Sequence, residues 1–93
     1  MKKVYLAVRK NRKYDSEGEV TFECIVKILD MFEEERDAEE KVDEDYYSMM
    51  DELDDYELRV YNENVELIDC STYESDGSYV SYMWEVIELE VKK

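Results

Sequence analysis

Carboxylates are the only abundant reactive side chains in this sequence of 93 residues, which holds 27 Asp and Glu, 12 Lys and Arg, and no histidine. Two carboxylates held close together can act as general acid and general base. At this density such pairs arise by chance, and none lies in an apolar segment that would raise one pKa. The commonest general base and metal ligand is missing with histidine. We therefore predict that the protein is not an enzyme.

Motifs for other kinds of chemistry are missing as well. Gly18 and Gly77 are the only glycines, so the chain has no glycine-rich phosphate loop, and the acidic segments lack the glycine and spacing of a calcium loop. Cys24 and Cys70 lie far apart in the sequence, and we expect two free thiols, with Cys24 buried as a small apolar residue on a strand. The sequence predicts no cofactor and no metal site.

The charge is unevenly distributed along the chain. The formal net charge is −15; residues 30–58 carry 15 acids and two bases, whereas residues 1–13 carry six bases and no acid. Such a chain repels nucleic acid and anionic membranes, so we predict a basic protein partner and no direct contact with nucleic acid or membrane. The apolar run Val4–Val8 is too short for a signal peptide, which favours a cytoplasmic protein.

The apolar pattern predicts an α+β fold with the element order β-β-α-β-β-β. Alternating side chains predict strands at Lys3–Arg9, Glu19–Leu29, Tyr56–Asn62, Val65–Tyr73 and Ser78–Val91. The second strand has the clearest pattern, with one apolar face formed by Val20, Phe22, Cys24, Val26 and Ile28. We expect residues 1–93 to form one domain of two layers, an antiparallel sheet of about five strands with one long acidic helix on one face.

Several local features are also predicted. Asp76-Gly77 is typical of a two-residue hairpin loop, which would pair Tyr73 with Val80 and Asp69 with Trp84. In the last strand the apolar residues stand at even positions up to Val86 and at odd positions from Ile87 onward, which suggests a β-bulge near Val86. Residues 62–64, Asn-Glu-Asn, indicate a turn. The helix has two candidate capping boxes, which are Asp30 with Glu33 and Asp37 with Glu40.

The helix predicted within residues 33–56 has two unlike sides. Its apolar stripe, which we expect to be buried, consists of Ala38, Val42, Tyr46, Met49, Leu53 and Tyr56 and is widened by Met50. The opposite line of the helical wheel passes through Glu33, Asp37, Glu40, Glu44, Tyr47, Asp51 and Asp55. We call these seven residues the acidic row and predict that they bind the partner. In an unbroken helix the acidic row would span about 33 Å.

The acidic row has two interpretations, a recognition surface and a solvated helix face. Solvated faces usually mix acids with bases at i,i+4, and this row contains no base. Its acids also continue to the C-terminal end, where the helix dipole disfavours them. Tyr47 would supply contact area to a partner. Tyr14, Tyr61 and Tyr79 are further candidates, with a half-buried position at the rim as the alternative for each.

In size, composition and the acidic segment from Glu33 to Asp55, the chain resembles the small acidic inhibitors encoded by phages and mobile elements. These include anti-CRISPR proteins, anti-restriction DNA mimics and uracil-DNA glycosylase inhibitors. The resemblance implies an inhibitor that occupies the basic nucleic-acid groove of a host defence enzyme. Two alternatives stay open, an immunity or antitoxin protein that masks a toxic nuclease and an acidic phage protein without an inhibitory role. Competitive or allosteric action and the oligomeric state stay open too.

Overall fold

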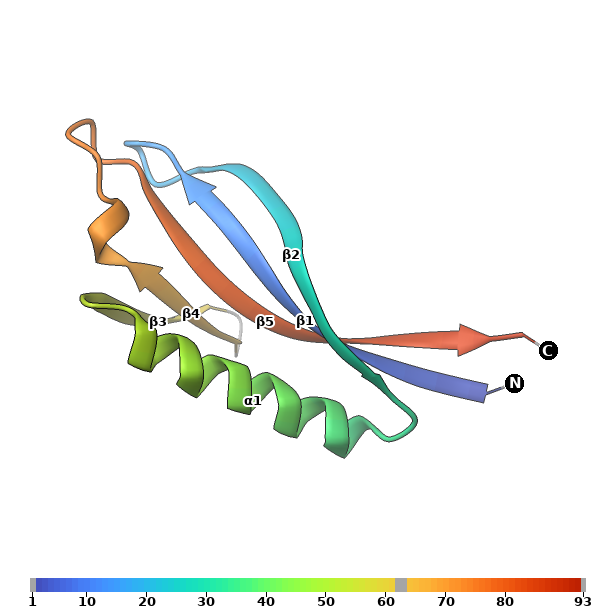
Figure 1. The fold of residues 1–93 in the computed structure, drawn as a ribbon. Coiled ribbons are helices and arrows are strands. Elements are labelled where there is room, and N and C mark those ends of the chain that lie inside the picture. Colours follow the sequence, from blue (N-terminus) through green and yellow to red (C-terminus); the bar gives the residue numbers. More distant parts are fainter. Residues whose placement is uncertain (1, 62–63, 93) are drawn as a thin grey trace.

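The computed structural model describes residues 2–61 and 64–92, and there it shows one antiparallel sheet with a single α-helix (Figure 1). The strand order across the sheet is β2-β1-β5-β4-β3. The elements are β1 (Lys2–Tyr14), β2 (Val20–Phe32), α1 (Glu35–Glu52), β3 (Tyr56–Tyr61), β4 (Asn64–Asp69), the 3-10 helix η1 (Cys70–Thr72) and β5 (Tyr79–Val91). The predicted α+β class and element order are confirmed. The predicted turn at 62–64 lies mostly outside the described residues.

β1 and β2 form a hairpin of two 13-residue strands, longer than predicted. In the turn between them, Oδ1 of Asp15 accepts hydrogen bonds from the backbone N–H groups of Glu17 and Glu19, both at 2.9 Å. Gly18 has a φ of 83°, which favours glycine. Because residues 15–19 suffice to reverse the chain, β1 extends beyond Arg9 as far as Tyr14. At its far end β2 continues past Leu29 to Phe32, which pairs with Tyr5.

β5 determines the layout of the sheet. It pairs with β1 in unbroken register along all 13 residues, so both ends of the chain lie side by side at one end of the sheet (Figure 1). On its other side β5 pairs with β4 only over residues 80–83. Among the described residues, the remainder of β5 has no second neighbouring strand.

The predicted apolar stripe of α1 is confirmed from Ala38 to Met49. It is wrong at its end, because the helix stops at Glu52, Leu53 follows it, and Tyr56 begins β3 and is 37% exposed. The helix crosses one face of the sheet against β1, β2 and β5. Ala38 is fully buried and Met49 is 8% exposed. The core cluster beneath the helix contains Met49, Leu67 and Trp84, with Leu29, Val42, Tyr46, Met50, Leu53 and Tyr82 packed against it.

A polar contact also joins the helix to the sheet. Oδ2 of Asp45 accepts a hydrogen bond of 2.7 Å from Nε1 of Trp84 and lies 3.2 Å from Nη1 of Arg9. Asp45 follows Ala38 by seven residues, which is two helical turns, so it falls on the inward side of α1. Asp45 was not predicted to face inward, although its spacing from Ala38 is visible in the sequence.

The prediction that Val20, Phe22, Cys24, Val26 and Ile28 share one face of β2 is wrong, and so is the predicted burial of Cys24. The pairing of β1 with β2 has three register shifts, and one of them leaves Val26 as an extra residue between the partners of Arg9 and Lys10. A bulge of this kind reverses the alternation, so Phe22 and Ile28 lie on opposite faces of the sheet. Both side chains are exposed, and Cys24 is half-buried instead of buried.

The hairpin register predicted around Asp76-Gly77 is also wrong. β4 ends at Asp69, four residues earlier than expected, and Asp69 pairs with Val80 instead of Trp84. Oδ1 of Asp69 accepts hydrogen bonds from the backbone N–H and the hydroxyl of Ser71, which starts η1 and stops the strand. A side chain that satisfies nearby backbone donors competes in this way with strand pairing.

Two smaller predictions fail as well. β5 has no bulge near Val86, since its register with β1 is continuous there. With continuous alternation, Val80, Tyr82, Trp84 and Val86 lie on the helix side of the sheet, and Ile87, Leu89 and Val91 lie on the opposite side, which Met83 also faces. Neither predicted capping box forms, since the N-cap of α1 is Glu34 and makes no side-chain cap hydrogen bond.

Candidate functional site

The outward side of α1 is a dense acidic surface. The 18 residues of the helix include nine acids and two bases. No base lies in the last turn, where a positive charge would stabilise the helix. The members of the acidic row that lie within the helix are all exposed, namely Asp37, Glu40, Glu44, Tyr47 and Asp51.

The acidic row is shorter than predicted. Glu33 precedes α1 and Asp55 follows it, so neither has helical spacing to the others, although both are exposed. From Asp37 to Asp51 the row spans about 21 Å at a rise of about 1.5 Å per residue. Glu33 is also engaged, because its carboxylate lies 2.5 Å from Nζ of Lys2, and this hydrogen bond lowers the pKa of Glu33.

The bases of β1 are used inside the molecule. Five of its six bases form ion pairs with acids of the same chain, namely Lys2–Glu33, Lys3–Glu88, Arg9–Asp45, Lys10–Glu85 and Arg12–Glu23. In the described structure the only ion pair of a row acid within α1 is that of Glu44 with Lys41, at 3.6 Å. Asp37, Glu40 and Asp51 form no ion pair with described residues. The negative charge of the helix surface is therefore largely uncompensated.

A hollow of about 480 Å³ lies beside this surface, between the first half of α1 and the part of β5 that β4 does not cover. Its lining combines the apolar side chains of Val42, Trp84 and Val86 with the helix acids Glu35, Glu39 and Asp43. Glu85 also lines the hollow, but its carboxylate is already paired with Lys10. The combination of apolar surface with helix acids suits a lysine or arginine, whose carbon stem packs on apolar surface while its charge meets carboxylates. These acids were not predicted as site residues, although Glu35, Glu39 and Asp43 repeat every four residues in the sequence.

Tyr47 is an exposed aromatic side chain supported by the core. It is 63% exposed, and its ring lies edge-on to that of Tyr46, with 5.2 Å between centroids. Tyr46 in turn contacts Trp84 edge-on, also at 5.2 Å. Tyr47 is thus an exposed ring that contacts the core through Tyr46. Tyr14 is buried and so is not a surface contact, Tyr79 is half-buried, and the side chain of Tyr61 lies outside what is described.

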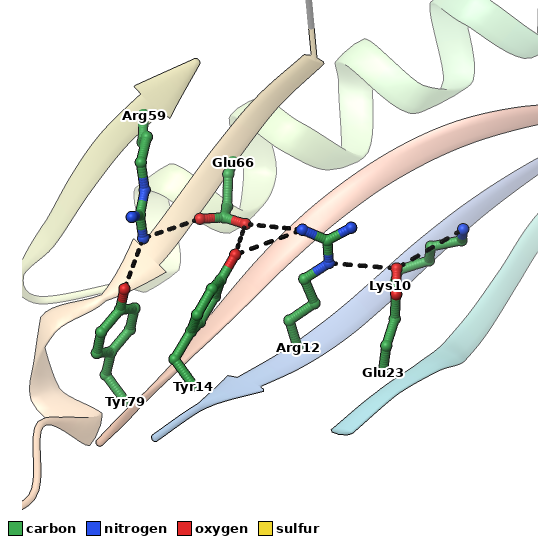
Figure 2. A network of polar contacts seen from close by, with 7 residues as sticks. All are labelled: Lys10, Arg12, Tyr14, Glu23, Arg59, Glu66 and Tyr79. Carbon is green, nitrogen blue, oxygen red and sulfur yellow. Dashed lines mark hydrogen bonds and ion pairs between the residues drawn. The ribbon is translucent and has the colours of Figure 1, made fainter. Parts of the chain in front are cut away.

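A second polar cluster lies on the sheet face opposite the helix (Figure 2). Glu66 is fully buried, and its Oε2 accepts a hydrogen bond of 2.5 Å from the hydroxyl of Tyr14. Arg59 Nη2 lies 3.0 Å from Oε1, and Arg12 Nη1 lies 3.7 Å from Oε2. Arg59 also donates a 2.8 Å hydrogen bond to the hydroxyl of Tyr79. The carboxylate is enclosed by three partners.

This cluster joins strands that are distant in sequence. Tyr14 stacks on Tyr79 with centroids 4.8 Å apart, and the guanidinium of Arg59 lies 5.3 Å from the Tyr14 centroid. Burial, followed by the hydrogen bond to Glu66, raises the pKa of Tyr14, so its hydroxyl keeps the proton that it donates. The hydrogen bond from Arg12 to Tyr14 raises the pKa of Arg12. The cluster ties β1, β3, β4 and β5 together, which is a structural role.

The remaining side chains that could bind a metal ion or react are scattered over the described residues. Within the residues 2–61 and 64–92, no three His, Cys, Asp or Glu side chains are grouped so as to hold a metal ion. Cys24 and Cys70 are free, as predicted, and burial raises the pKa of the Cys70 thiol. The one long helix in the described part is too polar to cross a membrane.

Comparison of the chain with protein-family models, with curated proteins and with solved structures found no match. Function is therefore inferred from the exposure, charge and geometry of the residues described above.

Proposed function

We propose that this protein is a non-enzymatic inhibitor that binds the basic nucleic-acid groove of a host defence nuclease or CRISPR effector. The observation that supports this function is the largely uncompensated acidic surface of α1. The helix contains nine acids and two bases, and among the described residues the only base of β1 that pairs with a helix acid is Arg9, whose partner Asp45 lies on the inward side. Occupying the groove would exclude nucleic acid by competition. Such enzymes act in the cytoplasm of the host cell, which is where the proposal places this protein.

The spacing of the acidic row suits a phosphate-binding groove. Successive row members in α1 are three or four residues apart, a rise of about 4.5–6 Å. Phosphates along one strand of DNA are about 6–7 Å apart, so lysines and arginines arranged for phosphates would meet carboxylates at similar intervals. Long-range attraction between surfaces of opposite charge would also make association fast.

Two features would add affinity to this charge complementarity. The hollow beside Trp84 would accept one lysine or arginine of the partner, with its stem on Val42 and Val86. Tyr47 would present an exposed ring that lies edge-on to Tyr46. Interfaces usually depend on a few aromatic and arginine anchors of this kind.

The acids at the end of α1 support binding over a purely structural role. Asp51 and Glu52 lie in the last turn, where the helix dipole disfavours negative charge by a few tenths of a kcal/mol each. Helix stability alone would favour lysine or arginine at these positions. A basic partner would remove this cost by neutralising both carboxylates.

Charge reversal on the acidic row tests the proposal. We expect the triple variant Glu40→Lys, Glu44→Lys and Asp51→Lys to lose capture of the partner from host lysate. The matched control is Glu17→Lys, Glu74→Lys and Glu90→Lys, three exposed acids outside the helix. Each variant changes the net charge from −15 to −9, because each reversal adds two units. Equal losses in both variants would contradict the proposal, since net charge alone would then explain binding.

Displacement by DNA tests the mechanism. The captured protein should bind double-stranded DNA itself, and added DNA should release it from the inhibitor. Raising the salt from about 50 to 500 mM should weaken the complex by at least tenfold, as screening shortens the range of charge attraction. A complex that persists unchanged under both treatments excludes competition for the groove. A captured toxic nuclease would identify an immunity protein instead.

A further inference from the structure

β2 is an open sheet edge of unusual length. It forms the outermost strand, and in the described structure it pairs with β1 alone. Its 13 residues correspond to about 43 Å of strand at about 3.3 Å per residue. The backbone N–H and C=O groups of an edge strand that point away from its neighbour can pair with another strand. In β2 the N–H of Met31 is an exception, because it donates a 2.8 Å hydrogen bond to Oδ1 of Asp30.

This edge is also apolar. Six large apolar side chains of β2 are each between 45% and 60% exposed: Val20, Phe22, Ile25, Val26, Ile28 and Met31. Exposed apolar residues that occur singly need no explanation, but a contiguous set on one strand indicates an interface. The bulges of β2 place these side chains on both sides of the sheet, so a strand added to the edge would cover both sets.

β2 carries little charge compared with the remainder of the chain. Its charged residues are Glu23, Lys27 and Asp30, a net charge of −1 in a chain of −15. Glu23 is already paired with Arg12 at 3.2 Å and with Lys10 at 3.9 Å (Figure 2). Two copies of this acidic protein would repel one another over α1, and β2 is an edge where that repulsion is small.

The pattern of apolar and charged residues in the middle of β2 is palindromic, so two antiparallel copies of the strand can match residue type for residue type. Phe22–Ile28 reads apolar, charged, apolar, apolar, apolar, charged, apolar from either end, and the two charges, Glu23 and Lys27, are opposite in sign. In an antiparallel arrangement about a two-fold axis, like charges therefore do not meet. We infer that the β2 edge binds the β2 edge of a second copy, which joins the two sheets into one.

This inference is independent of the proposed function, and the two respond to salt in opposite ways. Salt weakens attraction between the acidic helix and a basic partner, but it screens the repulsion between two copies of charge −15. The test is sedimentation equilibrium at about 1–500 μM protein in about 50 and 500 mM NaCl. We expect reversible association to twice the chain mass of 11.3 kDa, severalfold stronger at the higher salt.

Two matched variants locate the interface. Ile28→Lys should weaken self-association by about tenfold or more, as expected for a lysine placed in an apolar contact. Val60→Lys makes the same charge change at a 74% exposed valine on β3, the other edge of the sheet, and should leave association unchanged. Both changes lower the net negative charge, so added repulsion would not explain a loss. Ile25→Lys provides a second β2 variant, and circular dichroism checks that all three fold.

Three results would overturn the inference. The first is a wild-type protein that stays monomeric at every concentration and salt, which would leave the β2 edge to another partner. The second is open-ended association beyond the dimer or association that weakens with salt. The third is an equal effect of Ile28→Lys and Val60→Lys.

Discussion

Removing the hydroxyl of Tyr14 tests the buried cluster around Glu66. This hydroxyl donates a 2.5 Å hydrogen bond to a carboxylate with no exposed surface, and Tyr14 itself is 7% exposed. Tyr14→Phe keeps the ring that stacks on Tyr79 and removes only the donor. A hydrogen bond to a charged group contributes about 1.5–3 kcal/mol, and this is the expected loss in the free energy of unfolding.

A loss of that size is easily measured in a small protein. A domain of this length has a total free energy of unfolding of about 5–14 kcal/mol. The melting temperature should fall by about 10 °C, and the urea midpoint by roughly 1–2 M. Trp84 is the only tryptophan and is 7% exposed, so its fluorescence together with circular dichroism reports unfolding.

The matched control is Tyr47→Phe, which makes the same chemical change at a 63% exposed ring. It should change the free energy of unfolding by less than about 0.5 kcal/mol. In the Glu66→Gln background, Tyr14→Phe should cost at least about 0.5 kcal/mol less than in the wild type, because the charged acceptor is gone. The reasoning fails if Tyr14→Phe matches the Tyr47→Phe control or costs the same in both backgrounds.

Three further outcomes are expected. Asp45→Asn weakens the polar contacts of α1 with β1 and β5, and urea titration should show a loss of about 1.5–3 kcal/mol with altered Trp84 emission. Asp69→Ala removes the acceptor for Ser71 at the start of η1 and should cost about 1 kcal/mol in thermal unfolding. Burial raises the pKa of Tyr14 above its ordinary value of 10.0, so its stabilising contribution is complete below pH 10 and is lost as the pH rises through the folded-state pKa. Urea titrations from pH 8 to 11 should therefore show the difference between wild type and Tyr14→Phe shrinking.

Local patterns in the sequence predict the elements better than their partners. The stripe from Ala38 to Leu53 predicts the inward side of α1, since residues three and four apart share a helix face whatever the helix packs on. Alternation likewise predicts five strands. The hairpin register predicted from Asp76-Gly77 is wrong, because Asp69 accepts hydrogen bonds from Ser71 and β4 ends there. Alternation of apolar and polar residues does not reveal a competing local interaction of this kind.

The buried polar residues were not predictable in the same way. In the sequence, nothing distinguishes Asp45 and Glu66 from the other acids. Only the fold brings Arg9 and Trp84 to Asp45. The fold likewise brings Tyr14 and Arg59 to Glu66. Each contact joins residues that are separated by seven to 52 positions along the chain. The pairing of strands that creates these neighbours is a property of the whole sheet.

By itself, the sequence determines that one helix has an apolar side and an acidic side, because helical spacing is local and needs no partner. The tertiary structure alone decides which charges stay uncompensated and which apolar side chains stay exposed. It pairs Lys2, Lys3, Lys10 and Arg12 of β1 with acids outside α1 and pairs Arg9 with the inward Asp45, which leaves the outward side of α1 negative. It also places β2 at the edge of the sheet, where bulges and the lack of a second neighbour expose the strand with the clearest apolar alternation.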